Sequence, residues 1–155
     1  MATEIERKYL VNGNEWREGA GKGLLCRQGY LSLDKERVVR IRRIGEAAYL
    51  TIKGLRQGIA CPEYEYAIPV EDAEEMLENT CIKPLIEKIR YEVKYKGLVW
   101  EIDEFAGDNL GLIIAEVELE SESQTVYLPP WVGEEVSNDR RYANAALVVC
   151  PYIKW

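Results

Sequence analysis

Residues 3–10 read Thr3-Glu4-Ile5-Glu6-Arg7-Lys8-Tyr9-Leu10, and a charged side chain returns at every second position from Glu4 to Lys8. In an extended strand, side chains two residues apart lie on the same face. Glu4, Glu6 and Lys8 therefore form one row of two carboxylates and an ammonium, while Ile5 and Tyr9 lie on the opposite face. A single strand of this kind is typical of the solvated edge of an antiparallel sheet, so its meaning depends on whether the pattern recurs.

The same alternation recurs in six further stretches of the chain. Each stretch has charged side chains on one face and aliphatic or aromatic side chains on the other. The basic members of the charged face are Arg40, Arg42, Lys53, Lys88 and Arg90. The acidic members outside the first stretch are Glu63, Glu65, Glu101, Asp103, Glu116 and Glu118. A period of two with short turns between the stretches predicts seven or eight antiparallel strands.

Two segments break the alternation and favour helices. Residues 71–78 are amphipathic, with acidic side chains in the first turn, where the helix dipole stabilises them. A second helix is predicted over residues 139–147, with Ser137 or Asn138 as its cap. Residues 12–22 are expected to form a loop with at most a short helical turn around Trp16. We expect one mainly β (α+β) domain over residues 1–155, an eight-stranded antiparallel barrel or tunnel with a few flanking helices.

Two arrangements of the sheet fit this alternation. In one, an open sheet covers an apolar core and its charged face meets water. In the other, the sheet closes and its charged face lines a tunnel. Neighbouring arginines such as Arg40 and Arg42 are suited to bidentate contacts with anions, which favours the tunnel. The tunnel also predicts that Arg40, Arg42, Lys53 and Glu118 are shielded from bulk water while they line one cavity.

The composition limits the chemistry that such a tunnel could perform. The 155 residues include 20 lysines and arginines and 27 aspartates and glutamates, which give a formal net charge of −7. This acidity argues against nucleic acid or an anionic membrane as a partner. Histidine is absent, which excludes histidine-activated nucleophiles and histidine zinc sites. Catalysis would therefore use carboxylates, lysine, arginine, tyrosine or a metal held by oxygen atoms.

The first ten residues and the cysteines indicate the cellular compartment. Residues 1–10 contain no apolar run long enough for a signal peptide or a membrane span, so we expect a cytoplasmic protein. The four cysteines are widely spaced and form no Cys-x-x-Cys pair. This spacing favours reduced, mostly buried thiols over a metal or redox centre.

Clustered bases and clustered acids on one lining suit a polyanion that carries its own divalent metal. Lysine and arginine neutralise phosphate oxygens, and carboxylates hold a hard cation that bridges to the phosphates. With oxygen ligands and a phosphate substrate, Mg²⁺ or Mn²⁺ is favoured over Zn²⁺ or Cu²⁺. The residues therefore predict a small-molecule polyphosphate as the ligand.

The order of these motifs resembles that of the CYTH superfamily, the triphosphate tunnel metalloenzymes. Residues 4–8 resemble its Glu-x-Glu-x-Lys signature, and the charged pairs follow in the order that this family uses. The stretch Asp139-Arg140-Arg141-Tyr142-x-Asn144 is similar to its closing helix. The resemblance covers nearly the whole chain. It implies an eight-stranded β tunnel that binds a linear triphosphate and hydrolyses a phosphoanhydride bond with the help of a divalent metal.

The resemblance also implies roles for individual residues. The residues near the reacting phosphate and the attacking water would be Glu6, Lys8 and Glu65. Phosphate oxygens would be bound by Lys8, Arg40, Arg42, Lys53, Lys88 and Arg90. The metal would be held by carboxylates from the set Glu4, Glu6, Asp103, Glu116 and Glu118. Which carboxylate orients the water stays open.

Other activities are compatible with the same resemblance. The superfamily includes class IV adenylate cyclases and thiamine triphosphatases, whereas this short chain is similar to compact bacterial members that look like inorganic triphosphatases. A cyclase needs a nucleobase pocket, and no stretch of the sequence marks one. A non-catalytic polyphosphate-binding module is the alternative from a different class. Such a module would need the basic set but not the ordered carboxylates that this chain retains.

Overall fold

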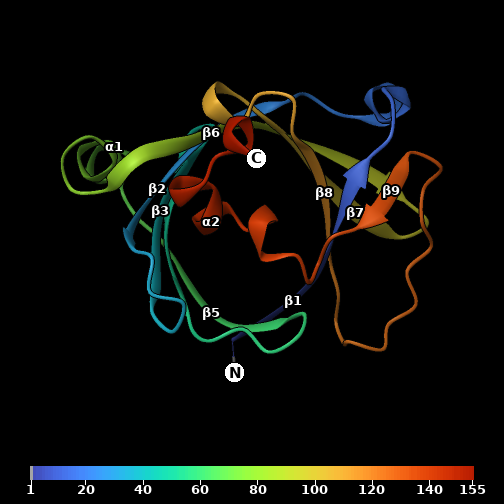
Figure 1. Ribbon diagram of the computed structural model, residues 1–155, viewed down its shortest axis with the longest axis horizontal. Helices are drawn as coiled ribbons and strands as arrows, with labels where there is room; N and C mark the ends of the chain where they lie inside the picture. The colour runs from blue at the N-terminus through green and yellow to red at the C-terminus, as the bar shows by residue number, and fades with distance from the viewer. Residues whose placement is uncertain (1) are drawn as a thin grey trace.

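Nine strands form one antiparallel sheet in the computed structural model, which describes residues 2–155. The strands are β1 (Thr3–Val11), β2 (Leu24–Ser32), β3 (Val38–Ile44), β4 (Ala47–Lys53), β5 (Ala60–Ala67), β6 (Ile82–Tyr95), β7 (Leu98–Phe105), β8 (Ile113–Glu118) and β9 (Val132–Glu135). Their order is β5-β4-β3-β2-β6-β7-β8-β1-β9, and β1 also pairs with β5. Strands β1 to β8 therefore close into the ring seen in Figure 1, which confirms the predicted barrel.

Strand β1 closes the barrel because it is paired on both edges. On one edge it lies beside β8, where Glu6 is opposite Glu118 and Lys8 is opposite Glu116. On the other edge its first residues pair with β5 and its last residues pair with β9. Since the whole sheet is antiparallel, every second side chain of β1 faces the lumen.

The apolar face of the alternation lies outside the barrel, where other segments cover it. The outer face of β1, β6, β7 and β8 carries Tyr9, Val93, Trp100 and Val117, all of them buried. The 3₁₀ helix η1 (Glu15–Gly19) lies over this face and inserts Trp16 into the cluster. The short helical turn expected around Trp16 is therefore confirmed.

Helix α1 (Val70–Asn79) covers a different part of the outer wall. Its Ala73 and Leu77 are buried against Ile41 of β3 and Ala48 of β4. Pro69 precedes the helix, and acidic side chains occupy its first turn, as the sequence predicts. No helix within residues 2–155 is long and apolar enough to cross a membrane.

The helix predicted over residues 139–147 is wrong in part. The chain instead forms a 3₁₀ helix, η3 (Arg140–Tyr142), followed by helix α2 (Asn144–Val149). They are separated by Ala143, whose φ of −66° and ψ of 135° are extended. The Asp139 carboxylate accepts a hydrogen bond from the backbone N–H of Arg141 at 3.1 Å and so caps η3. Two further 3₁₀ helices are η2 (Gly107–Asn109) and η4 (Tyr152–Lys154).

Helix α2 lies inside the ring of strands, as Figure 1 shows. Its Leu147 is fully buried, and it belongs to a cluster with Tyr30, Phe105 and Ile114. On their strands, these three residues lie on the face that carries the charged residues of the lumen. They lie at the barrel end where β2 and β7 finish and β8 starts. We call residues 140–149 the C-terminal plug, because they fill this end of the barrel with apolar side chains.

Candidate active site

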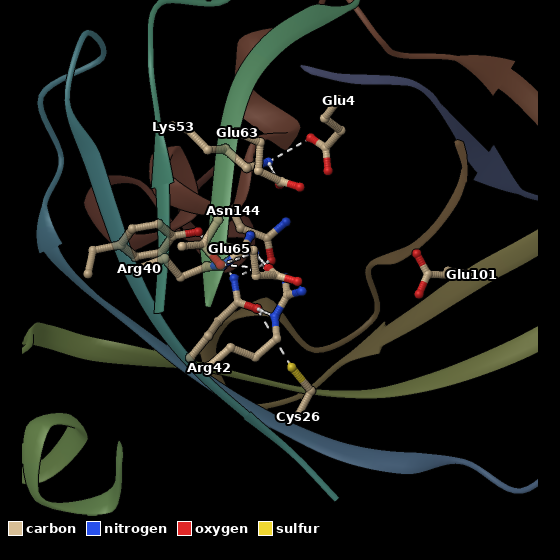
Figure 2. Close-up of polar contacts among 12 residues, drawn as sticks. Glu4, Cys26, Arg40, Arg42, Lys53, Glu63, Glu65, Glu101 and Asn144 are labelled. Atoms are coloured by element: carbon tan, nitrogen blue, oxygen red, sulfur yellow. Dashed lines mark hydrogen bonds and ion pairs between the residues drawn. The ribbon is translucent and has the colours of Figure 1, made fainter. Parts of the chain in front are cut away.

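A cavity of about 800 Å³ occupies the rest of the lumen. Strands β1, β3, β4, β5, β6, β7 and β8 all contribute to its wall, and Figure 2 shows part of this lining. Most of the predicted site residues line it, namely Glu4, Glu6, Lys8, Arg40, Arg42, Lys53, Glu65, Arg90, Glu116 and Glu118. The alternation in the sequence therefore brings both charge sets to one place.

Lys88 and Asp103 are the two predicted site residues that the structure does not bring to the cavity wall. Their side chains have no exposed surface and form an ion pair of 2.7 Å. Asp103 also accepts hydrogen bonds from Arg90 Nε at 2.8 Å and Nη2 at 2.9 Å. Burial alone would raise the pKa of the Asp103 carboxyl, but Lys88 and Arg90 outweigh it and hold that pKa well below its usual range. Asp103 thus fixes the Arg90 guanidinium at the cavity wall.

The C-terminal plug is tied to this buried network through Asn144. The Asn144 side-chain oxygen accepts from Lys88 Nζ at 2.9 Å and from Gln28 Nε2 at 3.1 Å. Gln28 in turn accepts from Arg42 Nε at 2.9 Å. The sequence reasoning placed Asn144 in a closing motif but gave it no contact, because nothing local indicates that the plug enters the lumen.

The cations of the cavity divide into paired and unpaired groups. Lys53 lies between two carboxylates, 2.8 Å from Glu4 and 3.4 Å from Glu63, as Figure 2 shows. Arg40 Nη2 donates to Thr51 at 3.1 Å and to Glu65 at 3.4 Å.

By contrast, Lys8 and Arg42 form no ion pair with any carboxylate in the described chain, residues 2–155. Burial and the charges of Arg40 and Arg90 lower the pKa of the Arg42 guanidinium. The cavity therefore offers cations, Lys8 and Arg42 among them, that no carboxylate of residues 2–155 holds in an ion pair.

The carboxylates on β1 and β8 are crowded. Glu6 and Glu116 are both buried, and they lie on neighbouring strands. Burial raises the pKa of Glu6 well above its ordinary value, and the charges of Glu116 and Glu4 add to the effect. Burial would also raise the pKa of Glu116, but the charges of Lys8, Arg90 and Lys88 together outweigh it, and that pKa is lowered to about 2. A bound cation would relieve the repulsion within this set.

The carboxylates of the cavity have the chemistry that a hard divalent cation needs, but they do not form a preformed metal site. All of its candidate ligands are carboxylate oxygens, which Mg²⁺ and Mn²⁺ prefer. However, no three His, Cys, Asp or Glu side chains of residues 2–155 already lie close enough together to hold a metal.

Three carboxylates of the cavity lining are exposed to solvent. They are Glu65, Glu101 and Glu118, and the side chains of Glu65 and Glu101 are 38% and 39% exposed. The expectation that Glu118 is shielded from water is wrong, because β8 ends at Glu118 and the barrel opens. Arg40 and Lys53 are shielded as expected, with 9% and 22% of their side chains exposed.

Sequence reasoning gave no site role to two of the carboxylates that line the cavity, Glu63 and Glu101. Both have the parity of the charged face, so the alternation already contained the signal. Glu63 lies within 3.4 Å of Lys53, and Glu101 lies 3.2 Å from Arg90. Each therefore offsets the charge of a cation to which the sequence analysis gave the role of binding phosphate oxygens.

Known proteins resemble this chain over nearly its whole length. The CYTH domain model matches residues 2–145. An inorganic triphosphatase from Acetivibrio thermocellus is 49% identical over 152 residues, which cover 98% of this chain and 97% of the relative. An inorganic triphosphatase from Nitrosomonas europaea is 39% identical over 151 residues, with coverages of 95% and 97%. The crystal structure of the inorganic triphosphatase NE1496 superposes with a TM-score of 0.66 at 38% identity, and the match covers 96% of each chain.

Proposed function

The chain belongs to the CYTH domain family, and on this premise we propose that it hydrolyses inorganic triphosphate inside its barrel. The observation that carries the proposal is that one cavity holds Lys8 and Arg42, which form no ion pair within residues 2–155, beside a crowded row of carboxylates. The cations suit phosphate oxygens, and the carboxylates suit a metal that phosphate chemistry uses. The inorganic triphosphatases that cover this chain almost completely support the choice of substrate.

The phosphate cradle is proposed in two parts. Lys8 and Arg42 bind phosphate oxygens directly, since neither has to break an ion pair with a carboxylate first. Arg40, Lys53 and Arg90 bind them after partial exchange of their carboxylate partners. Lys88 and Asp103, both fully buried, hold Arg90 in place from behind and do not contact the substrate.

A divalent cation, Mg²⁺ or Mn²⁺, would be held by carboxylates of Glu4, Glu6, Glu116 and Glu118. When bound, it would neutralise charge on the phosphate oxygens and polarise the reacting phosphorus centre. Glu6 would lose its proton as the cation binds, because ligating carboxylates are ionised. A cation among these carboxylates would therefore oppose the effect of burial, Glu116 and Glu4, which raise the pKa of Glu6.

The attacking water needs a carboxylate to orient it and accept its proton. Glu6 and Glu65 are the candidates, and they differ in their surroundings. Glu65 accepts a hydrogen bond from Thr51 Oγ1 at 2.7 Å, and 38% of its side chain is exposed. Glu6 is buried among other acids. We assign the role to one of these two, with Lys8 stabilising the charge that develops on the phosphate.

The test is phosphate release from tripolyphosphate, pyrophosphate, ATP and thiamine triphosphate, each with Mg²⁺ or Mn²⁺. Tripolyphosphate should be the best substrate, because pyrophosphate reaches fewer of the cations that line the cavity. Chelation of the metal should abolish the activity.

Cyclic AMP as the main product from ATP would overturn the proposal in favour of a cyclase. Binding of tripolyphosphate without hydrolysis in either metal would favour a polyphosphate-binding module. Thiamine triphosphate as the best substrate would instead place the chain with the thiamine triphosphatases.

A further inference from the structure

Asn144 of the C-terminal plug lines the cavity, and only half of its side-chain amide is used within the fold. Its Oδ1 accepts hydrogen bonds from Lys88 Nζ at 2.9 Å and from Gln28 Nε2 at 3.1 Å. Its Nδ2 carries two N–H donors and forms no hydrogen bond within residues 2–155. This nitrogen is not among the buried polar atoms of the described chain that lack a partner, so it is accessible from the cavity.

The neighbours of Asn144 fix the orientation of its amide. Lys88 is an ammonium with donors and no acceptor, so it must face the Asn144 oxygen. Gln28 is oriented in the same way, because its Oε1 accepts from Arg42 Nε at 2.9 Å and its Nε2 then points to Asn144. A flipped Asn144 amide would set a donor against a donor at both contacts. The two Nδ2 donors are therefore held toward the cavity before any ligand binds.

Three cations surround Asn144 in this hydrogen-bond network. Lys88 donates to it directly, and Arg42 and Arg90 are each one further side chain away. Burial lowers the pKa of Lys88 to about 8, and the charges of Arg90 and Arg42 add to this effect although Asp103 opposes it. A fourth cation at position 144 would be repelled by the other three, whereas a neutral amide adds donors without that cost. The free donors of Asn144 thus lie where an anion is attracted.

We infer that Asn144 Nδ2 donates a hydrogen bond to a phosphate oxygen of the bound triphosphate, at the end of the cavity that the plug fills. The inference rests on the proposed function and adds a binding residue to it. Ionised phosphate oxygens are acceptors, so they match an N–H donor that the fold leaves free. A donor that is already held in place binds without a further loss of side-chain freedom. The plug is then part of the substrate site as well as part of the apolar packing.

The first test compares the binding of tripolyphosphate by the wild type and by Asn144→Asp, measured by calorimetry without metal. The carboxylate keeps the oxygen that Lys88 and Gln28 contact, but it replaces the free N–H donors by an acceptor. We expect affinity to fall at least about tenfold, because a charge-assisted hydrogen bond is lost and a repelling charge takes its place. Asn79→Asp is the matched control, since it makes the same change of charge at an exposed residue of α1 outside the cavity. It should bind tripolyphosphate as the wild type does.

The new charge of Asn144→Asp weakens binding even without a direct contact, so the second test observes the contact itself by NMR on isotope-labelled wild type. The side-chain NH₂ signal of Asn144 is identified by its absence from the spectrum of Asn144→Asp. With saturating tripolyphosphate and no metal, one of its two protons should move downfield and show coupling to phosphorus across the hydrogen bond. If Asn144 only holds the plug through its oxygen, no such coupling arises.

An Asn144 signal without phosphorus coupling at saturation would overturn the inference, and so would wild-type affinity of Asn144→Asp. If this variant does not fold, the NMR measurement on the wild type decides by itself. Binding of tripolyphosphate without hydrolysis would overturn the proposed function alone, because the contact of Asn144 is measured without metal and without turnover. If tripolyphosphate does not bind at all, the proposed function and this inference are both wrong.

Discussion

Lys88 and Asp103 form an ion pair across β6 and β7 in which Nζ and Oδ2 are 2.7 Å apart and neither side chain has exposed surface. Replacing Asp103 leaves the Lys88 ammonium buried without a carboxylate, whereas Asp103 without Lys88 keeps its hydrogen bonds from Arg90. Asp103→Leu should therefore lower the free energy of unfolding by about 3 to 5 kcal/mol, measured by urea denaturation. Lys88→Met/Asp103→Leu should be less destabilised than the sum of the single variants. Additive losses would show that the two side chains are not coupled.

Arg42 is a cation of the cavity lining that forms no ion pair with a carboxylate of residues 2–155. Arg42→Met should weaken the binding of tripolyphosphate by about tenfold to a hundredfold, since one charge-assisted contact of about 1.5 to 3 kcal/mol is lost. Calorimetry in the absence of metal measures this without turnover. Arg17→Met is the control, because Arg17 is bound to Glu104 on the outside of the barrel. Equal affinity of the wild type and Arg42→Met would remove Arg42 from the cradle.

A variant at Glu118 tests metal binding separately from phosphate binding. Glu118→Gln keeps the size of the side chain but removes a charge that we assign to the metal, so hydrolysis of tripolyphosphate should collapse. Metal-free binding of tripolyphosphate should be at least as tight as in the wild type, because one repelling carboxylate is gone. Glu120→Gln, two residues beyond in the exposed loop and outside the cavity lining, should hydrolyse at the wild-type rate. Undiminished hydrolysis by Glu118→Gln would contradict the assignment.

The raised pKa of Glu63 predicts that the stability of the protein depends on pH. Burial and the charge of Glu4 raise the pKa of Glu63 to about 7. Between the unfolded value near 4.5 and this folded value, the native state holds a proton that the unfolded chain has lost. The stabilisation that this Glu63 proton gives the native state is thus complete below about pH 4.5 and is lost as the pH rises through 7.

Glu63→Gln removes this dependence, because the amide does not titrate. The free energy of unfolding of the variant minus that of the wild type should rise by about 1 to 3 kcal/mol from pH 5 to pH 8. Urea unfolding of both proteins at the two pH values measures the difference. A constant difference across that range would show that Glu63 does not hold the proton.

The alternation of charge assigned side chains to the lumen because the period of a strand does not depend on its tertiary partners. It did so correctly for Glu4, Glu6 and Lys8 on β1. Parity gives the face of a side chain but not its depth along the barrel. Lys88 and Asp103 lie on the same face of the sheet as Arg90. They are nevertheless where the plug covers the lumen, and only the folded chain places the plug there.

The C-terminal region was the least predictable part of the fold. Its helix is interrupted at Ala143, a residue with high helix propensity, because the chain turns there to place α2 inside the barrel. Tertiary packing of Leu147 therefore overrides the local preference. Strand β9 was missed because it has four residues and contains Gly133, so it lacks a recognisable alternation.

Pairing of β1 with β8 joins Glu6 to Glu118 across most of the sequence. Loop closure over such a distance loses chain entropy before any contact compensates for it. Barrels dominated by contacts of this kind fold in milliseconds to seconds, far more slowly than helical bundles of equal size. Until β1 and β8 meet, the carboxylates and arginines of the lumen remain on an open, solvated sheet. The two charge sets therefore enclose a common lumen only once β1 has paired with β8.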